Sequence, residues 1–368
     1  MDRIYYWLWL AEGLGPGCRG TGRLLAQWPD PRRLYEYLAA GGAVPRGITP
    51  RAAQTLHAVR PEYLAGRVQY CASSGIAILT PDSPDYPRRL LDLPDLPLIL
   101  YATGNTACLN GRRYVGMVGT RRPTAYGSHA CRDLSAELAR QGIVIVSGLA
   151  DGLDGEGHRA AVREGACTVA FLGTAINHTY PAVNRELRSE MERLGGAVLS
   201  EYPPDYPGRM TGTFLARNRL IAGLSEVLCV AEARMRSGTL NTVGHAEQYG
   251  RPVLAVPGSI YSPSSAGTNE LLRTGRAGVL CRAADVLARL GMPCDDARPP
   301  RAPRETPPSG LSREARTVLT GLGPQPLTPG ELAAATALPV QTVLAALTEL
   351  ELNDAAVAHP GGRYTAVE

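Results

Sequence analysis

The stretch YVGMVGTRRPTAYG at residues 114–127 joins a short apolar run to a Gly-containing turn and the start of a helical segment. Apolar runs of this kind recur as far as residue 258. They are YVGMVG (114–119), IVIVS (143–147), TVAFLG (168–173), AVLS (197–200), EVLCVAE (226–232) and PVLAVPG (252–258). Short apolar strands that alternate with helices predict an α/β fold, here a Rossmann-like, doubly wound parallel sheet covered on both faces.

The sequence on either side of this core has a different pattern. Helical periodicity around the Gly-Leu-Gly-Pro turn at 13–16 predicts a small helical domain, which is followed by a Pro-rich connection that ends in the strand-like run LILYATG. The C-terminal part predicts two or three helices and a hairpin with Gly361 and Gly362 at its tip, as in a winged helix. We therefore divide the chain into a helical domain with its connector (1–105), the core (106–290), a Pro- and Arg-rich linker (291–310) and a winged-helix domain (311–368).

Composition excludes some chemistry. The chain has 368 residues, 44% of them hydrophobic, and a net charge of +4, which permits a nucleic-acid partner without requiring one. All 38 basic residues are Arg. Without lysine the chain can form neither a pyridoxal-phosphate Schiff base nor a P-loop, and Arg is suited to bidentate phosphate contacts.

The cysteines and the N-terminus predict the compartment. None of the eight cysteines forms a C-x-x-C pair, so we expect reduced thiols in the core and no metal site. The start MDRIYYWLWLAEGLGPG has an apolar run that is too short to span a bilayer, and it lacks an A-x-A cleavage site. The expectation is a cytoplasmic protein with no membrane span.

Four polar, Gly-containing segments follow predicted strands. In a doubly wound sheet the carboxyl ends of the strands lie side by side, and glycine lets backbone amides approach an anion near the positive N-terminus of the next helix. The expected ligand is a phosphate group. The segments are Gly119-Thr120-Arg121-Arg122, Ser147-Gly148-Leu149-Ala150-Asp151-Gly152, Gly173-Thr174-Ala175-Ile176-Asn177 and Arg236-Ser237-Gly238-Thr239-Leu240-Asn241.

Arginines near the same edge favour a chain of phosphates over a single nucleotide. They are Arg121, Arg122, Arg185, Arg209, Arg217, Arg219, Arg234 and Arg236. A dinucleotide site is not predicted, because the spacing after Gly116 is not G-x-G-x-x-G and the second strand ends at Ser147-Gly148 without an acidic residue.

We expect the other polar clusters to have a structural role and not a catalytic or metal-binding one. Asp151, Asp154 and His158 could form a metal or acid/base cluster, but no Cys or second His stands at ligand spacing, and a carboxylate and His at i, i+4 more often stabilise the start of a helix. Ser147 lacks the G-x-S-x-G context of a nucleophile. We therefore expect no catalytic residue and no cofactor.

Taken together, an ordered series of motifs over about residues 112–285 resembles the DNA-processing protein A (DprA/Smf) family. The motifs are VGTRRPTAYG, IVSGLADGLDGEGHRAA, FLGTAINHTYPAVNREL, SEYPP, FLARNRLIAGLSEVLCVAEARMRSGTLNTVGHAEQYGRPVLAVPG and GTNELLRTG. The flanks agree with the family plan of an N-terminal domain similar to a sterile-alpha-motif fold and a C-terminal winged helix.

The resemblance implies a non-catalytic homodimer that binds single-stranded DNA during natural transformation and transfers it to the RecA recombinase. The family's G-[ST]-R motif, which contacts a DNA phosphate, falls on Gly119, Thr120 and Arg121. A basic residue after Y-P-x-x-N belongs to the same groove, and Arg185 stands there. A third basic position before F-x-x-R-N-R has Arg209 as its nearest counterpart.

The residues themselves add candidates for the same interface. Arg217 and Arg219 are two apart on a helix and cannot share a face, so we place Arg217 in the groove and expect at least one of the pair to bind an acid such as Glu201. An aromatic side chain of this region could stack on a base, and Tyr180 is preferred over Phe171, Tyr202 and Phe214. The full nucleic-acid site expected is Gly119, Thr120, Arg121, Arg122, Gly148, Asn177, Tyr180, Arg185, Arg209, Arg217, Ser237, Gly238 and Thr239, of which the last three could instead cap a helix.

Two alternative functions stay open. A Rossmann-type phosphoribohydrolase has a P-G-G-x-G-T-x-x-E loop similar to residues 236–242, but Thr242 stands where that family has its catalytic Glu. A winged-helix transcription regulator would prefer a duplex operator. Duplex DNA therefore remains a second candidate partner at the winged helix, where Arg363 is the one basic residue of the predicted wing.

Overall fold

The computed structural model describes residues 2–206, 212–293, 311–323, 326–353, 355–359 and 361–366. Within these residues the apolar runs of the core form one sheet with the strand order β1-β2-β6-β5-β4-β3-β7-β8-β9. Strands β3 to β9 are parallel to one another. They are β3 (Tyr114–Val118), β4 (Val144–Ser147), β5 (Thr168–Phe171), β6 (Ala197–Ser200), β7 (Val227–Val230), β8 (Val253–Ala255) and β9 (Gly278–Val279).

The parallel sheet predicted from the sequence is confirmed, and the structure adds an antiparallel edge. Strand β2 (Leu100–Gly104) pairs antiparallel with β6, and β1 (Ala77–Leu79) pairs antiparallel with β2. The sequence analysis assigned LILYATG to the end of a connection, yet most of this run lies inside the sheet. The sheet therefore takes strands from both sides of residue 105, and the division of the chain at that residue stays a prediction.

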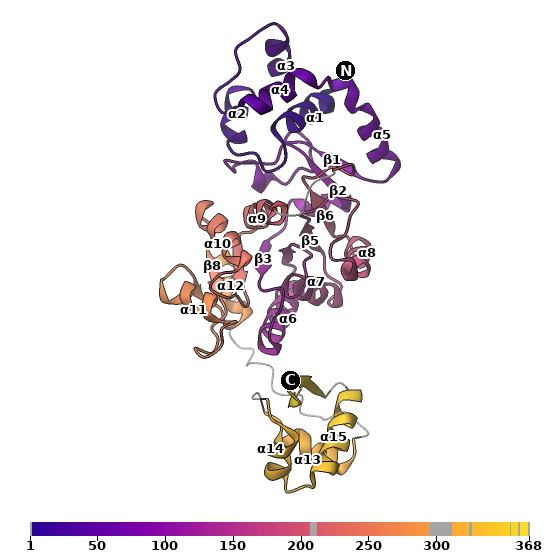
Figure 1. Cartoon of the computed structure of the whole chain (residues 1–368), viewed down its shortest axis with the longest axis vertical. Helices are drawn as coiled ribbons and strands as arrows, with labels where there is room; N and C mark the ends of the chain where they lie inside the picture. The colour runs from indigo at the N-terminus through magenta and orange to yellow at the C-terminus, as the bar shows by residue number, and fades with distance from the viewer. Residues whose placement is uncertain are drawn as a thin grey trace. The chain divides into compact units, whose positions relative to one another are not determined.

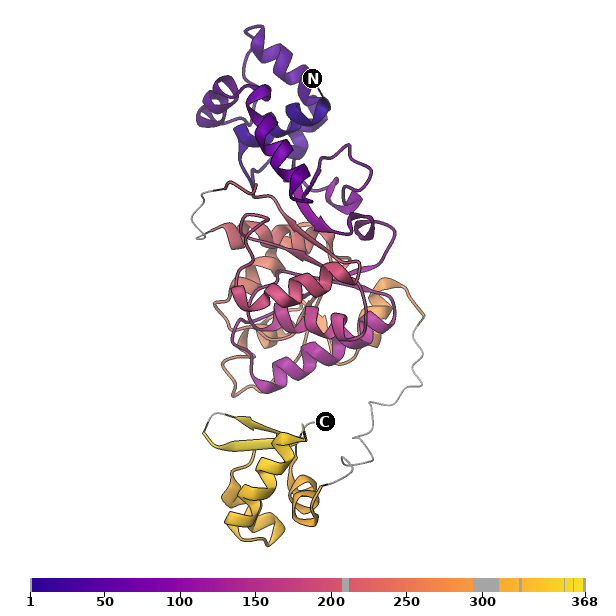
Figure 2. The ribbon, with the colours of Figure 1, turned by 90° about the vertical axis from the view of Figure 1, so that its right-hand side faces the viewer.

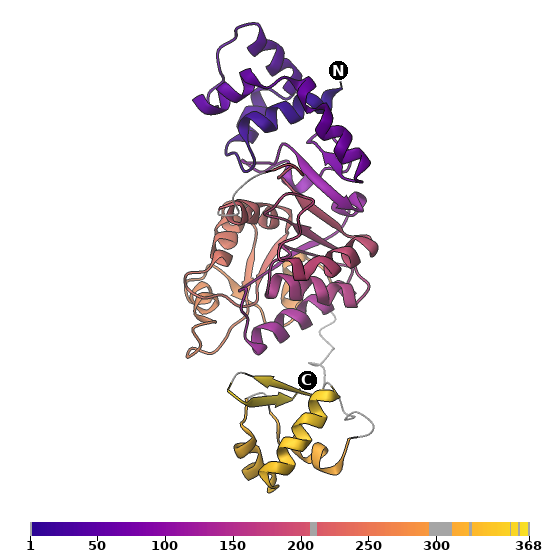
Figure 3. The same cartoon turned by 45° about the vertical axis from the view of Figure 1, so that its right-hand side comes forward.

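Helices cover both faces of the sheet, because alternate residues of each strand point to opposite sides. Val115, Met117 and Ile145 pack in one core with α6 (Ala125–Arg140), α7 (Leu153–Arg163) and α12 (Ala283–Leu290). Val118 and Val146 pack in another core with α9 (Thr213–Leu224), α10 (Gly238–Gln248) and α11 (Ala266–Arg273). Helix α8 (Arg185–Arg193) covers β5 and β6, and the strands lie between the helical layers (Figure 3).

Five further helices at the N-terminus gather next to β1 and β2 (Figures 1 and 2). They are α1 (Arg3–Leu14), α2 (Thr21–Gln27), α3 (Pro31–Ala39), α4 (Pro50–Ala58) and α5 (Ala65–Ser73). Asp30 and Thr49 cap α3 and α4, each followed by Pro at the first helical position, as expected for helix starts. Trp9 is buried and donates from Nε1 to the carbonyl of Leu56 at 2.9 Å.

The chain divides into two compact units, Met1–Cys294 and Asp295–Glu368. The second unit contains α13 (Arg313–Gly321), α14 (Pro329–Thr336), α15 (Val340–Leu352) and the antiparallel strands β10 (Ala356–His359) and β11 (Arg363–Ala366). Thr328 and Glu331 form a capping box at the start of α14. Three helices followed by a two-stranded wing confirm the predicted winged helix.

Among the described helices, none is by itself long and apolar enough to cross a membrane. Helices α14 and α15 meet that test only when they are taken together, across a bend of 108°.

Candidate nucleic-acid interface

The strand order creates a crevice at the carboxyl ends of β3 and β7. From β3 the chain winds outward through β4, β5 and β6, and then returns to place β7 on the other side of β3. Ligands of open α/β sheets bind at such a switch point. A pocket of about 220 Å³ lies there, lined by residues that follow both strands, among them Thr120 and Arg121 after β3 and Ser237 to Thr239 after β7.

Backbone hydrogen bonds hold the Gly119-Thr120-Arg121 loop. The Thr120 amide donates to the carbonyl of Glu232 at 2.9 Å, and the Leu153 amide donates to the carbonyl of Thr120 at 3.2 Å. Gly152 has a φ of 72°, and a Cβ there would lie 2.4 Å from the Thr120 carbonyl oxygen. Only glycine fits both the backbone angle and the space, so Gly152 fixes the loop that carries Arg121.

Glu232 secures the start of the helix that follows this loop. Its carboxylate is buried and accepts from the Thr124 amide at 2.9 Å and from the Thr124 hydroxyl at 2.7 Å. The Thr124 hydroxyl in turn caps α6 by accepting from the Gly127 amide. A buried acid at this point reduces the positive potential of the helix N-terminus, so the positive charge of the loop comes mainly from arginine side chains.

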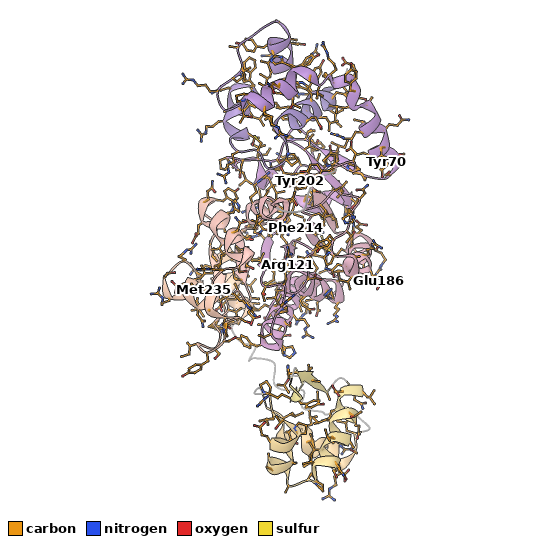
Figure 4. The ribbon with its side chains drawn as sticks, in the orientation of Figure 1. Tyr70, Arg121, Glu186, Tyr202, Phe214 and Met235 are labelled. Atoms are coloured by element: carbon orange, nitrogen blue, oxygen red, sulfur yellow. The ribbon has the colours of Figure 1, made fainter. Side chains whose placement is uncertain are left out.

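Arg121 lies beside two aromatic rings, half-buried Phe214 and exposed Tyr180. Its guanidinium carbon is 5.2 Å from the centroid of the Phe214 ring, and Figure 4 labels both side chains. The Phe214 and Tyr180 rings are 5.7 Å apart. Tyr180 is 42% exposed, whereas Tyr202 is only 3% exposed. Tyr202 was a sequence candidate for base stacking, and its burial is the reason to discard it. Exposed rings beside a guanidinium can stack on bases while the cation meets the backbone.

Arg217 lies beneath these groups, and here the structure differs from the sequence-based expectation. The side chain is 3% exposed, and Nη1 donates to the carbonyl of Gly148 at 2.6 Å and also to that of Phe171. The Arg217 guanidinium fills the space where a Gly148 Cβ would stand, with Nη1 only 2.4 Å from that position. Gly148 and Arg217, predicted to contact DNA, are therefore buried against each other.

Arg219 is the second buried arginine of α9. It is 3% exposed, and its Nη2 lies 2.5 Å from Glu201 Oε1, the acid that the sequence analysis suggested as a partner. Its Nε lies 3.9 Å from Asp95. We name Arg217 and Arg219 together the floor, because both are buried on α9 and bonded to protein atoms, and Arg217 of the two lines the crevice.

The start of α10 forms the opposite wall of the pocket. The Ser237 hydroxyl accepts from the Thr239 amide at 3.1 Å, so Ser237 is the N-cap of this helix. Gly238 is exposed and Thr239 is buried. The helix-capping role considered for these residues is therefore present, and the same three residues also line the pocket, where the helix N-terminus favours an anion.

Five exposed arginines stand on segments that follow the carboxyl ends of strands. They make no ion pair within the described part of the chain, and we name them the rim. They are Arg121, Arg122, Arg185, Arg234 and Arg236. Asn177 is also exposed, in the loop after β5. Arg209, which the sequence analysis added to the same groove, lies outside the described residues.

Asp154 and His158 are buried at the start of α7. Burial raises the pKa of Asp154, against the lowering effect of Arg217. Burial, with Arg217 and Arg159 nearby, lowers the pKa of His158 to about 3. Among the described residues no group of three or more His, Cys, Asp or Glu is arranged to hold a metal ion.

The pocket has no carboxylate at the position that a phosphoribohydrolase would use. Thr242 occupies that position, is 2% exposed and lines the pocket. Among the described residues that line it, Asp154 is the one acidic residue. This buried carboxylate is placed to balance Arg217, which opposes the rise of its pKa more strongly than the nearby Arg121 does.

Comparisons with known proteins agree with this geometry. Residues 77–291 match the family model of DNA recombination-mediator protein A, and residues 302–362 match the DprA winged helix domain. Protein Smf of Synechocystis is 35% identical over 318 residues, which cover 78% of this chain and 79% of that protein. DNA processing protein DprA of Bacillus subtilis is 38% identical over 216 residues, 59% of this chain and 72% of that protein.

Two solved structures are similar to the chain as well. DNA processing protein A from Streptococcus pneumoniae superposes with a TM-score of 0.64 at 30% identity, covering 78% of this chain and 98% of that one. The protein of the same name from Helicobacter pylori, whose structure describes a single-stranded DNA binding mode, gives a TM-score of 0.53 at 33% identity and covers 58% of this chain and 95% of that one.

Proposed function

This chain belongs to the DprA/Smf family of DNA recombination mediators, and on that basis we propose that it binds single-stranded DNA along the rim of its central sheet. The proposal continues with transfer of the bound strand to a RecA recombinase during natural transformation, in the cytoplasm. The family membership and the family relative with a described single-strand binding mode support it.

Arg121 is the observation that carries the proposal. It is exposed, it makes no ion pair within the described residues, and it stands on a loop that Gly152 and Glu232 hold in place. A solvated guanidinium at a strand end can bind a phosphate through two parallel hydrogen bonds. Tyr180, on the loop after β5, and Phe214, in the first turn of α9, can then stack on bases of the same strand.

A titration of a fluorescent oligothymidylate with the purified protein tests the proposal. We expect saturable binding that competing oligonucleotides of other base order displace equally well, because the rim contacts backbone phosphates. Duplex DNA of the same length serves as the competitor that separates this function from that of a transcription regulator. Tighter binding to one duplex sequence than to any single strand would overturn the proposal.

We propose no enzymatic role for the crevice. Thr242 in place of a catalytic Glu, and the balance of Asp154 by Arg217, leave no group poised to stabilise a sugar cation among the described residues that line the crevice. Incubation with nucleoside monophosphates, followed by chromatography for free base, tests this directly. Release of base above the background rate would restore the phosphoribohydrolase as the better candidate.

We also propose that two copies associate through the edge of the sheet that carries β8 and β9. The segment GTNELLRTGRAGVLCRAADVL (267–287) includes exposed Val279, and the loop after β8 exposes Ile260 and Tyr261 by 82% and 89%. Exposed apolar groups of this size are typical of protein contact surfaces. Light scattering of Val279→Arg tests the site, and an unchanged dimer would place the interface elsewhere.

The winged helix is a weaker candidate for DNA binding than the rim. Its helix α15 contains no basic residue, and Arg363 in the wing lies 3.6 Å from Glu331 and donates to the carbonyl of Pro326. Phosphate contacts require free cations. Duplex DNA as a partner of this unit remains a proposal, which a titration of Arg363→Ala with duplex DNA tests.

A further inference from the structure

The exposed apolar side chains of residues 106–293 gather at the same edge of the sheet as the rim. Among the described residues of this range, eight large apolar side chains are exposed. All of them except Val279 stand on a segment between the carboxyl end of a strand and the first turn of the next helix. They are Tyr126, Tyr180, Val183, Leu215, Met235, Ile260, Tyr261 and Val279. Single exposed apolar groups are common on protein surfaces, but a set confined to one edge indicates a contact surface.

Val183 stands on the segment after β5, on a turn that a buried neighbour holds in place. It is 75% exposed and lies two residues before the rim arginine Arg185. The next residue, Asn184, is 1% exposed, and its side-chain nitrogen donates to the carbonyls of Leu149 at 3.0 Å and Ala150 at 3.2 Å. The turn is fixed by Asn184 and not by Val183, so a polar substitution of Val183 should cost the fold little.

Met235 stands on the segment after β7, which lies on the other side of β3 in the strand order. It is 52% exposed and lies between the rim arginines Arg234 and Arg236. The Ala233 carbonyl accepts from the Gly267 amide at 2.8 Å, which holds this segment against the start of α11. Met235 is therefore also an exposed apolar group on a fixed segment, with a cation on each side.

Other apolar side chains connect these two ends. Tyr180, three residues before Val183, has its ring 5.7 Å from the ring of Phe214. The next residue, Leu215, is 49% exposed, and its Cδ2 lies 3.8 Å from the place of a Cβ on Gly238, at the start of α10. We name this set the apolar track. It consists of Val183, Tyr180, Phe214, Leu215 and Met235.

The apolar track and the rim run together from the loop after β5 to the loop after β7. In the view of Figure 4, Arg121 lies between Met235 and Glu186, the residue that follows Arg185. Arginines alone cannot distinguish a single strand from a duplex, because both present phosphates at their surface. The bases of a duplex are stacked and paired, whereas the bases of a single strand are free to meet apolar side chains.

We propose that the apolar track gives the rim its preference for a single strand over a duplex, with the bases facing the protein from Val183 to Met235 and the phosphates on the rim arginines. This inference rests on the proposed single-strand binding and adds the side chains that determine it. Every base has an apolar face, so such contacts tolerate any base order. A preference for single strands then coexists with indifference to sequence.

Polar substitutions test the two ends of the track. Val183→Ser and Met235→Gln should each weaken binding of an oligothymidylate by about threefold to tenfold, because an apolar contact with a base is lost. Affinity for a duplex of the same length should stay as in the wild type, since the arginines are intact. The ratio of single-strand affinity to duplex affinity should therefore fall in both variants.

Val44→Ser is the matched control. Val44 is 42% exposed in the segment between α3 and α4, so the same change is made outside the track. It should leave both affinities unchanged, and Val183→Ile, which keeps an apolar side chain, should bind as the wild type does. Melting curves show that each variant is folded. Equal single-strand affinity for the wild type, Val183→Ser and Met235→Gln would overturn the proposal.

A strand without bases separates a base contact from any other cause. An oligonucleotide of the same length built from abasic sites offers the same phosphates and no bases. The wild type should bind it more weakly than it binds the oligothymidylate, and Val183→Ser should bind it as tightly as the wild type does. An equal loss of affinity by Val183→Ser on both strands would mean that Val183 acts through the phosphate contacts, and the proposal would be wrong.

A measurement on the wild-type chain needs no substitution. Permanganate oxidises the ring double bond of exposed thymines, so a short oligothymidylate should lose reactivity when its bases face the protein. The control is the same mixture at high salt, which releases the strand and should restore the reactivity. Full reactivity of the bound strand would place the bases outward and contradict the proposal. Failure of the wild type to bind any single strand is a separate result, because it would overturn the proposed function itself.

Discussion

The floor and the rim are built from the same residue type, and burial separates their roles. Arg217 and Arg219 are each 3% exposed and bond to carbonyls or to a carboxylate. Arg121 is exposed, and no ion pair within the described residues involves it. A buried cation needs protein partners because desolvation is costly, whereas a cation in water keeps its hydrogen bonds free for a ligand.

This difference in burial predicts that substitutions of floor arginines and of rim arginines have different effects. Loss of a floor arginine leaves buried acceptors without donors and should reduce the stability of the fold. Loss of a rim arginine removes a phosphate contact and should reduce affinity at constant stability. The predictions below separate stability from affinity, beginning with the largest effect.

Arg217→Ala should lower the free energy of unfolding by about 2–5 kcal/mol. The carbonyls of Gly148 and Phe171 lose a buried donor, and buried Asp154 loses its neighbouring cation. Urea unfolding followed by circular dichroism measures the change. Arg185→Ala, a rim variant, is the control and should stay within about 0.5 kcal/mol of wild type. If Arg217→Ala kept the stability of the wild type but lost DNA binding, Arg217 would act as a DNA contact, as the rim arginines are expected to do.

Arg121→Ala should weaken single-strand binding by about tenfold to a hundredfold while the melting temperature stays the same. The variant loses charged hydrogen bonds to a phosphate, which contribute about 1.5–3 kcal/mol. Arg122→Ala, on the same loop, should cost less.

The control for Arg121 is Arg163→Ala. Arg163 is exposed at the C-terminal end of α7, and therefore at the opposite edge of the sheet from the rim. Anisotropy titrations of all three variants with one oligothymidylate give the comparison. Equal affinity for wild type and Arg121→Ala would mean that the loop is structural.

His158 lies beneath the floor and gives a pH-dependent prediction. The Thr168 hydroxyl donates to the Ile145 carbonyl at 2.6 Å, so the 2.7 Å contact makes His158 Nδ1 the donor and leaves Nε2 unprotonated and without a partner. A charge on Nε2 would be buried and unpaired. This agrees with the lowered pKa of about 3 in the fold.

The sign of the pH effect follows from that pKa. Between pH 6.5 and about pH 3 the unfolded chain binds a proton that folded His158 does not, so stability falls as the pH falls. At pH 5 the loss is about 2 kcal/mol. His158→Gln should flatten this part of the profile, and His178→Gln, at an exposed position, should not. If the free energy of unfolding of His158→Gln changed with pH as steeply as that of the wild type, His158 would not be buried in its neutral form.

The sequence predicted the parallel strands and the Gly119-Thr120-Arg121 loop because their signals are local. A run such as AVLS, buried on both faces, is apolar throughout, and the β6 strand matches it residue for residue. LILYATG was predicted to be strand-like, but its place in the sheet was not predicted, because it pairs antiparallel with β6, almost a hundred residues further along the chain. Pairing over that separation leaves no local signature.

The burial of both α9 arginines could not be predicted from the sequence for a related reason. The i, i+2 spacing showed that Arg217 and Arg219 point in different directions, which is correct, but it could not show that both directions are buried. The carbonyls that hold Arg217 come from Gly148 and Phe171, at the ends of two other strands. Glycine at 148 was read as an approach for a phosphate, whereas the space is taken by a guanidinium.

The smallest effect expected is on the salt dependence of DNA binding. This dependence reports how many rim arginines contact phosphates. Each phosphate neutralised on a single strand contributes about −0.7 to the slope of log K against log salt, so four or five rim arginines give about −3 to −3.5. Arg185→Ala should reduce the magnitude of the slope by about 0.7, since Arg185 is exposed at the start of α8 and forms no ion pair within the described residues. Arg188 on the same helix is the control, because it already binds Glu192 at 3.0 Å and has little free charge to offer; Arg188→Ala should keep the wild-type slope. Titrations at four salt concentrations measure all three slopes. A wild-type slope near zero, or equal slopes for wild type and Arg185→Ala, would mean that Arg185 is not part of the surface that meets DNA.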